Sequence, residues 1–142
     1  EVFSPKMLSE AKHFEVHNLK SGYLKNQDGK FTFVAFSSDL QVAPINCFVK
    51  SNFDSNKKEA VFAAGNYFGV SPYHSRFDGF SGALIKDAKT IVLGSTLGID
   101  LSQKAVRHLD MITLKGKKYL LVTVNNSKAE VYELPMIKEN KQ

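Results

Sequence analysis

The residues best suited to binding chemistry lie in one stretch, Asn66–Phe80. It holds five aromatic side chains, one histidine and an Arg/Asp pair within fifteen residues. Loops carry binding residues more often than strands do, and tyrosine and arginine are enriched in recognition surfaces. The residues that we expect in a binding surface are Tyr73, His74, Arg76 and Asp78. The alternative is a long crossover that packs its own aromatic rings, with Arg76 and Asp78 tied to each other.

Other reactive side chains lack the partners that catalysis or metal binding needs. No G-x-S-x-G motif is present, and Cys47 stands in the middle of a strand-like run, as a small core thiol does. The four histidines are scattered without metal spacing. His13 and His17 would share a helix face, but the residues from Val16 onward indicate the start of a strand. We expect no catalytic residue, no metal and no cofactor.

The charge of the chain does not indicate a nucleic-acid partner. There are 19 Lys and Arg against 14 Asp and Glu, giving a net charge of +5. The basic residues mostly alternate with acids, are dense only at Lys57–Lys58 and Lys115–Lys118, and are all lysine except Arg76 and Arg107. Nucleic-acid faces concentrate charge and favour arginine. The lysines therefore indicate exposed, solubilising turns.

Length and composition predict one folded domain. The chain has 142 residues, of which 43% are hydrophobic, and a single cysteine, so no internal disulfide can form. No apolar run approaches the roughly 20 residues of a membrane span. Because the sequence begins at Glu1 without an apolar signal segment, we expect a mature or trimmed product.

Strands are the elements predicted to position these residues. Short runs rich in β-branched and aromatic residues, bounded by turn-forming residues, are typical of strands. The runs are Gly22–Lys25, Phe31–Phe36, Ile45–Phe53, Ala60–Ala64, Ala83–Ile85, Thr90–Leu93, Val106–Leu114, Tyr119–Val124 and Ala129–Leu134. One helix is predicted over Pro5–Phe14, with Ser4 as its cap.

An internal repeat groups these strands. Ser21–Leu24 recurs as Ser81–Leu84, 60 positions later, and Ile45–Asn66 matches Val106–Asn126 at nearly the same offset. The repeat predicts a set of two strands, then one of four, then one of three. We expect an all-β fold of antiparallel, propeller-like blades. These make a little over two blades, fewer than the four to eight of a closed ring.

Three segments resemble a known family. Leu19–Phe33 resembles the S-x-L-x-N-x-G-x-F blade motif of the FG-GAP/VCBS-repeat β-propellers. Ala64–Gly82 and Val106–Val131 are similar to the last blades of the ASPIC/UnbV-associated members, so the resemblance covers about residues 17–134. It implies an exported protein of the periplasm or outer-membrane surface of a Gram-negative cell. Because Asn66–Phe80 belongs to the structural pattern of that family, the resemblance favours packing over binding there.

The resemblance also implies a position for calcium, which this sequence has lost. Family blades often carry a D-x-[DN]-x-D-G-x-x-D loop, whose carboxylates surround the ion. The matching residues here are Asn52, Asp54 and Asn56, followed by two lysines and by Ala60 at the final acidic position. Calcium needs net negative charge, so we expect this loop to be empty.

Together these observations predict an N-terminal extension (1–18), one domain (19–134) and a C-terminal tail (135–142). The expected function is a non-enzymatic binding or assembly module with a protein or glycan partner. A carbohydrate-active or hydrolytic enzyme is the alternative, and the lack of a close pair of carboxyl groups speaks against it. A nucleic-acid binder using a basic face is the second alternative. Open sheet faces further predict self-association, a longer parent chain that covers them, or two sheets closed into a sandwich.

Overall fold

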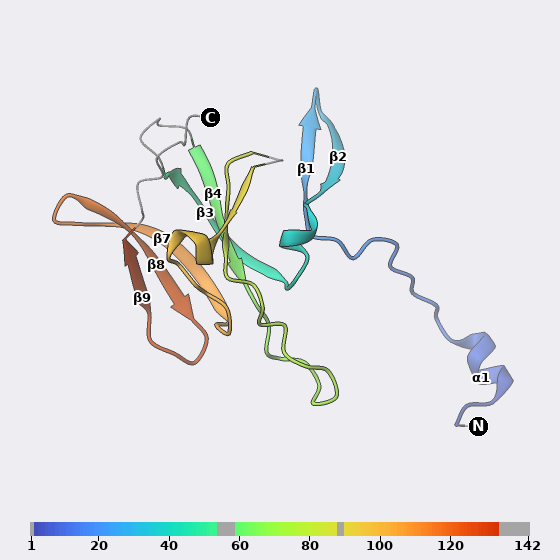
Figure 1. The fold of residues 1–142 in the computed structure, drawn as a ribbon. Coiled ribbons are helices and arrows are strands. Elements are labelled where there is room, and N and C mark those ends of the chain that lie inside the picture. Colours follow the sequence, from blue (N-terminus) through green and yellow to red (C-terminus); the bar gives the residue numbers. More distant parts are fainter. Residues whose placement is uncertain (1, 54–58, 88–89, 134–142) are drawn as a thin grey trace.

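Three antiparallel sheets make up most of the structure of residues 2–53, 59–87 and 90–133, the part of the chain that the computed structural model describes (Figure 1). The first sheet is a hairpin of β1 (Gly22–Gln27) and β2 (Lys30–Ala35). The second has the order β3 (Ile45–Asn52), β4 (Glu59–Gly65), β5 (Ala83–Ile85) and β6 (Ile91–Leu93). The third consists of β7 (Val106–Leu114), β8 (Lys117–Val124) and β9 (Glu130–Glu133). The predicted all-β class and the sets of two, four and three strands are confirmed, and no sheet closes on itself within these residues.

Two-residue turns set the register of the two tightest hairpins. Asp28 and Gly29 join β1 to β2 with φ of 52° and 83°, and Lys115 and Gly116 join β7 to β8 with φ of 50° and 77°. Two successive residues with positive φ form the turn whose twist matches that of the flanking strands. Sequence predicts the turns at Asp28, Gly29 and Gly116 because glycine and aspartate tolerate positive φ, whereas Lys115 adopts positive φ without that preference.

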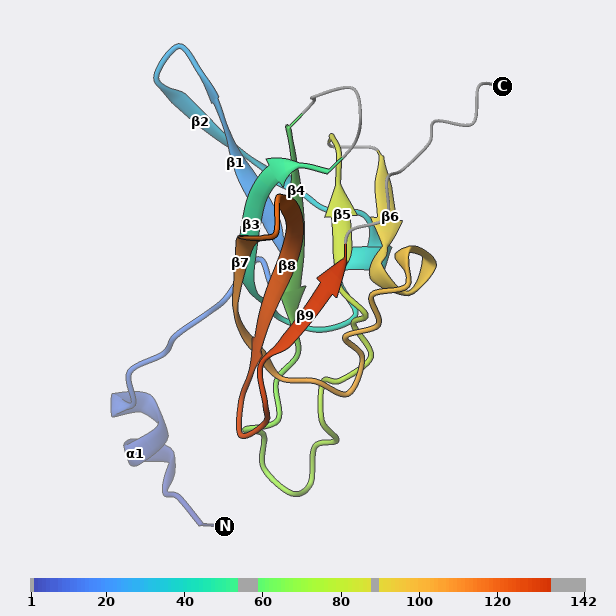
Figure 2. The ribbon, with the colours of Figure 1, turned by 90° about the vertical axis from the view of Figure 1, so that its left-hand side faces the viewer.

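The main core lies between the four-stranded and the three-stranded sheets, which pack face to face (Figure 2). Alternate residues of each sheet point into this layer. Phe62 and Leu84 come from one sheet, and Leu109, Leu120 and Val122 come from the other. All five are buried, and each such side chain stabilises the fold by about 1.5–3 kcal/mol.

The opposite face of the four-stranded sheet is covered only in part. A second cluster forms there from Leu40, Ala43, Phe80 and Ala83. Leu40 belongs to a short 3-10 helix, η1 (Ser38–Leu40), which the sequence did not predict. The β1–β2 hairpin reaches the same face at its base, where the rings of Tyr23 and Phe36 lie 5.8 Å apart. The rest of this face is open to solvent.

The N-terminal helix is shorter than predicted. Helix α1 spans Pro5–Glu10 rather than Pro5–Phe14, with the Ser4 hydroxyl accepting from the Met7 amide at 3.3 Å. Its residues are all exposed, so no tertiary packing extends it, and short helices are unstable without packing. Between Ala11 and β1 the chain forms no helix or strand, and it lies away from the sheets (Figure 1). A further 3-10 helix, η2 (Gly94–Leu97), was not predicted. Among the described helices, none has the length and apolar character needed to cross a membrane.

Candidate functional site

The predicted binding loop is clamped at its base by one buried amide. Asn66 follows β4 with φ of 73°, and its side chain is fully buried. Its Nδ2 donates to the carbonyl oxygens of Phe80 (3.0 Å), Leu101 (3.0 Å) and Lys104 (3.1 Å). Its Oδ1 accepts from the Phe80 amide at 3.0 Å. One side chain therefore joins both ends of the loop to the segment before β7. Sequence reasoning named Asn66 only as the start of the loop and missed this role.

The two sides of the loop are also joined to each other, beyond the hydrogen bonds of Asn66. Tyr67 and Phe77 exchange two backbone hydrogen bonds, of 2.8 and 3.0 Å. The Arg76 guanidinium lies over the Phe68 ring, 4.9 Å from its centroid. Within the described residues it forms no ion pair with Asp78, so the tie that the alternative interpretation of the loop included is not found there.

Three of the four predicted residues share one hollow. His74, Arg76 and Asp78 line a volume of about 530 Å³ in the loop. The His74 ring nitrogen Nδ1 lies 2.9 Å from the Ser71 hydroxyl. Tyr73 does not line the hollow and is 97% exposed at the loop tip. The loop can therefore present an aromatic ring beside a polar hollow.

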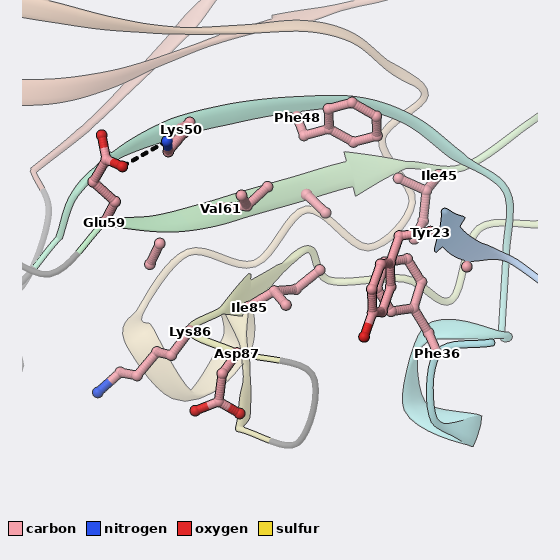
Figure 3. Close-up of a pocket in the computed structure, with 13 residues that line it drawn as sticks. Tyr23, Phe36, Ile45, Phe48, Lys50, Glu59, Val61, Ile85, Lys86 and Asp87 are labelled. Carbon is pink, nitrogen blue, oxygen red and sulfur yellow. Dashed lines mark ion pairs between the residues drawn. The ribbon is translucent and has the colours of Figure 1, made fainter. Parts of the chain in front are cut away.

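A second surface, which the sequence did not reveal, lies on the open face of the four-stranded sheet (Figure 3). We call it the groove. Phe48, Val61 and Ile85 form its floor, and the volume is about 390 Å³. Tyr23 and Phe36 stand at one end, as Figure 3 shows. Most of the surface that lines it is apolar, which distinguishes it from the hollow in the loop. Four charged residues also line it: Lys50, Glu59, Lys86 and Asp87.

Strand register explains the groove. Phe48 pairs with Ala63, and Lys50 pairs with Val61, which in turn pairs with Ile85. Paired residues point to the same face of a sheet, so these side chains gather on one side. Small Ala63 leaves space beside Phe48, whose side chain stays 68% exposed. An ion pair of 2.5 Å between Lys50 and Glu59 closes the far end.

The single cysteine is a core thiol, as predicted. Cys47 packs against the main core, and its Sγ donates to the Ala64 carbonyl at 3.7 Å. Burial raises the pKa of the thiol to about 11. A thiol with this pKa is protonated and unreactive at neutral pH.

A polar cluster ties the segment before β7 to β9. Lys104 Nζ donates to the Glu130 carboxylate at 2.5 Å and to the Tyr132 hydroxyl at 2.9 Å, and Tyr132 donates to Glu130. The hydrogen bond from Lys104 lowers the pKa of Glu130. Burial raises the pKa of Tyr132. Each of the three groups has its hydrogen-bond partners within the cluster, so we assign the cluster a structural role.

The predicted empty calcium loop can be followed only in part. Asn52 ends β3, whereas Asp54 and Asn56 lie outside the described residues. Within residues 2–53, 59–87 and 90–133, no three His, Cys, Asp or Glu side chains gather as metal ligands would. His17 contacts Glu15 at 3.5 Å in the exposed N-terminal segment.

The candidate site therefore consists of the loop hollow and the groove. Comparison of the chain with models of protein families, with curated proteins and with solved structures finds no match. A proposal for the loop hollow or for the groove therefore rests on the geometry of the structure alone.

Proposed function

We propose that the chain is a non-enzymatic binding or assembly module of an exported cell-envelope protein, built from propeller-like blades. The order of its sheets supports this proposal. Antiparallel strands follow one another in sequence within each sheet, and successive sheets stack. Propeller blades are connected and packed in this way, each with a neighbour on both faces.

The groove is the observation that carries the proposal. One face of the four-stranded sheet is sealed by the three-stranded sheet, while the groove leaves Phe48 and Val61 open on the other. Apolar patches on soluble proteins mark interaction sites. A small polar substrate would need several converging polar groups, and the groove floor offers none. An apolar polypeptide surface is the partner that fits it.

The loop supplies a second, more polar contact in the same proposal. Tyr73 projects beside the hollow that His74, Arg76 and Asp78 line. An exposed aromatic ring beside charged side chains suits a glycan or a polar peptide. No cofactor, metal or nucleic acid takes part in the proposed function.

Dye binding tests whether the groove is an open apolar site. The protein is diluted until light scattering gives the monomer mass of 15.8 kDa, and an apolar fluorescent dye is titrated in. Phe48→Lys is expected to weaken dye binding about tenfold, because it places a charge on the groove floor. The matched control is Phe31→Lys, an equally exposed phenylalanine on the hairpin, and it should leave binding unchanged. Equal dye binding by the wild type and Phe48→Lys would contradict the proposal.

A further inference from the structure

An apolar, strand-like segment of the N-terminal arm has no partner. We define the arm as residues 2–20, which are exposed throughout. Lys12 Nζ lies 5.1 Å from the centroid of the Phe14 ring, and Glu15 contacts His17 at 3.5 Å. Residues two apart share a face only in an extended chain. Phe14 and Val16 therefore project together, opposite Glu15 and His17.

This segment resembles the end of a strand within the four-stranded sheet. Residues 14–18, Phe-Glu-Val-His-Asn, match residues 62–66, Phe-Ala-Ala-Gly-Asn, at the first and last positions, with a small or β-branched apolar residue between. Residues 62–65 end β4, which pairs with β5. Ser21–Leu24, at the start of β1, matches Ser81–Leu84, at the start of β5. The offsets of the two matches differ, 48 and 60 positions, but in both cases the segment that ends in asparagine precedes the segment that begins with Ser-Gly. Residues 14–18 thus precede β1 as the end of β4 precedes β5, with a shorter connection between them.

The edge of β1 where such a strand would pair is open and borders the groove. In the part of the chain that the structure describes, β1 pairs only with β2. Gly22 and Tyr23 of β1 line the groove, and no residue of β2 does. A strand added to this edge would lie over Phe48 and Val61. Unpaired edges bind strands through main-chain hydrogen bonds, and pockets select alternate side chains.

The arm does not cover its own groove. Figure 1 shows it leaving the base of the hairpin and running away from the sheets. Where the arm joins the hairpin, the Asn18 Oδ1 accepts from the Lys20 amide at 3.0 Å, which fixes the turn between the arm and β1. The next residue, Ser21, is held by the Gln41 side chain through hydrogen bonds of 2.8 and 2.9 Å. Phe14 remains 78% exposed.

We propose that two copies of the chain exchange arms, with residues 12–18 of each copy bound along β1 and over the groove of the other. This inference rests on the proposed function, since it names the occupant of the groove. When two copies exchange arms about a two-fold axis, each groove is filled by the arm of the other copy, and the two arm–groove contacts are identical.

Complementation between two variants tests the exchange. Phe14→Lys should prevent the arm from binding, and Phe48→Lys should prevent the groove from binding an arm. Both residues are exposed, so circular dichroism should show that both variants are folded. Each variant alone is expected to sediment at 15.8 kDa, at a concentration where the wild type is a dimer. An equimolar mixture should regain dimers, because the intact arm of one variant meets the intact groove of the other. With one contact instead of two, the mixture should bind at least about tenfold more weakly than the wild type. Phe3→Lys, outside residues 12–18, is the control and should dimerise normally.

The other outcomes overturn the inference in distinguishable ways. A mixture that stays monomeric would exclude exchange in trans. If Phe14→Lys dimerised like the wild type while Phe48→Lys did not, the groove would bind another surface of the second copy, and the proposed function would stand. A monomeric wild type whose arm amides resist hydrogen exchange would show that the arm folds back on its own chain. A monomeric wild type whose dye binding is unaffected by Phe48→Lys would overturn the proposed function as well.

Discussion

Replacing Asn66 by aspartate should strongly destabilise the protein, although the two side chains have nearly the same shape. The wild-type amide donates to three carbonyl oxygens at 3.0–3.1 Å and accepts from one backbone amide. The substitution keeps the acceptor but puts a carboxylate oxygen against the three carbonyls. A buried acceptor without a donor costs about 1–3 kcal/mol, and an uncompensated buried charge costs about 3–5 kcal/mol. We therefore expect the free energy of unfolding to fall by about 3–5 kcal/mol at neutral pH.

The loss should also depend on pH. The surrounding carbonyl oxygens disfavour the charged form of the introduced carboxyl, so its pKa in the folded protein lies above that in the unfolded chain. The folded state then binds the proton more tightly, and the variant loses stability as pH rises from the unfolded pKa through the folded one. Below both values the protonated group can donate one hydrogen bond, so the loss is smallest in acid.

Urea unfolding of the wild type and Asn66→Asp across a pH series measures both effects. The control is Asn126→Asp, at an exposed turn residue with a similar φ of 54°, which should change stability by less than about 0.5 kcal/mol. A loss below about 1 kcal/mol for Asn66→Asp, or one independent of pH, would refute the role of Asn66 as a clamp.

Three further predictions follow from the packing. Gly65→Ala should cost about 2 kcal/mol or more in thermal unfolding, because the added Cβ would meet a backbone oxygen at 1.8 Å. Gly79→Ala, with no atom within 4 Å, is the control and should be nearly neutral. Glu130→Gln should cost about 1 kcal/mol at neutral pH. Because the pKa of Glu130 is lowered in the folded state, this difference should disappear as pH falls through that pKa, and a constant difference would contradict the ion pair. Cys47, with its pKa raised from 9.0 to about 11, should react with iodoacetamide about 100-fold more slowly in the native protein than in the unfolded chain; similar rates would contradict its burial.

Local sequence patterns were sufficient to predict the strands. Ala83–Ile85 and Val106–Leu114 were predicted with the bounds that the structure shows, because alternation and turn residues act within a few positions. The end of α1 was wrong because a helix without a packing partner stops early. Among the candidate binding residues, His74 and Arg76 come together since they are close in sequence.

Features that depend on distant residues could not be predicted. The Asn66 clamp joins carbonyls up to 38 positions away, which no local pattern encodes. The groove depends on the register that places Phe48, Val61 and Ile85 side by side from three strands. The sequence alone did not single out Phe48, because its neighbours on the same face of β3, Asn46 and Lys50, are polar.

The most direct test of assembly through the open sheet face is the mass of the wild-type protein as a function of concentration, with dye binding recorded on the same samples. If the groove is a docking surface, the weight-average mass should rise above 15.8 kDa between the low micromolar range and hundreds of micromolar. Dye binding should fall over the same range, because association covers the groove. A protein that stays at 15.8 kDa throughout, unfolds cooperatively and binds no apolar dye would contradict assembly through the groove.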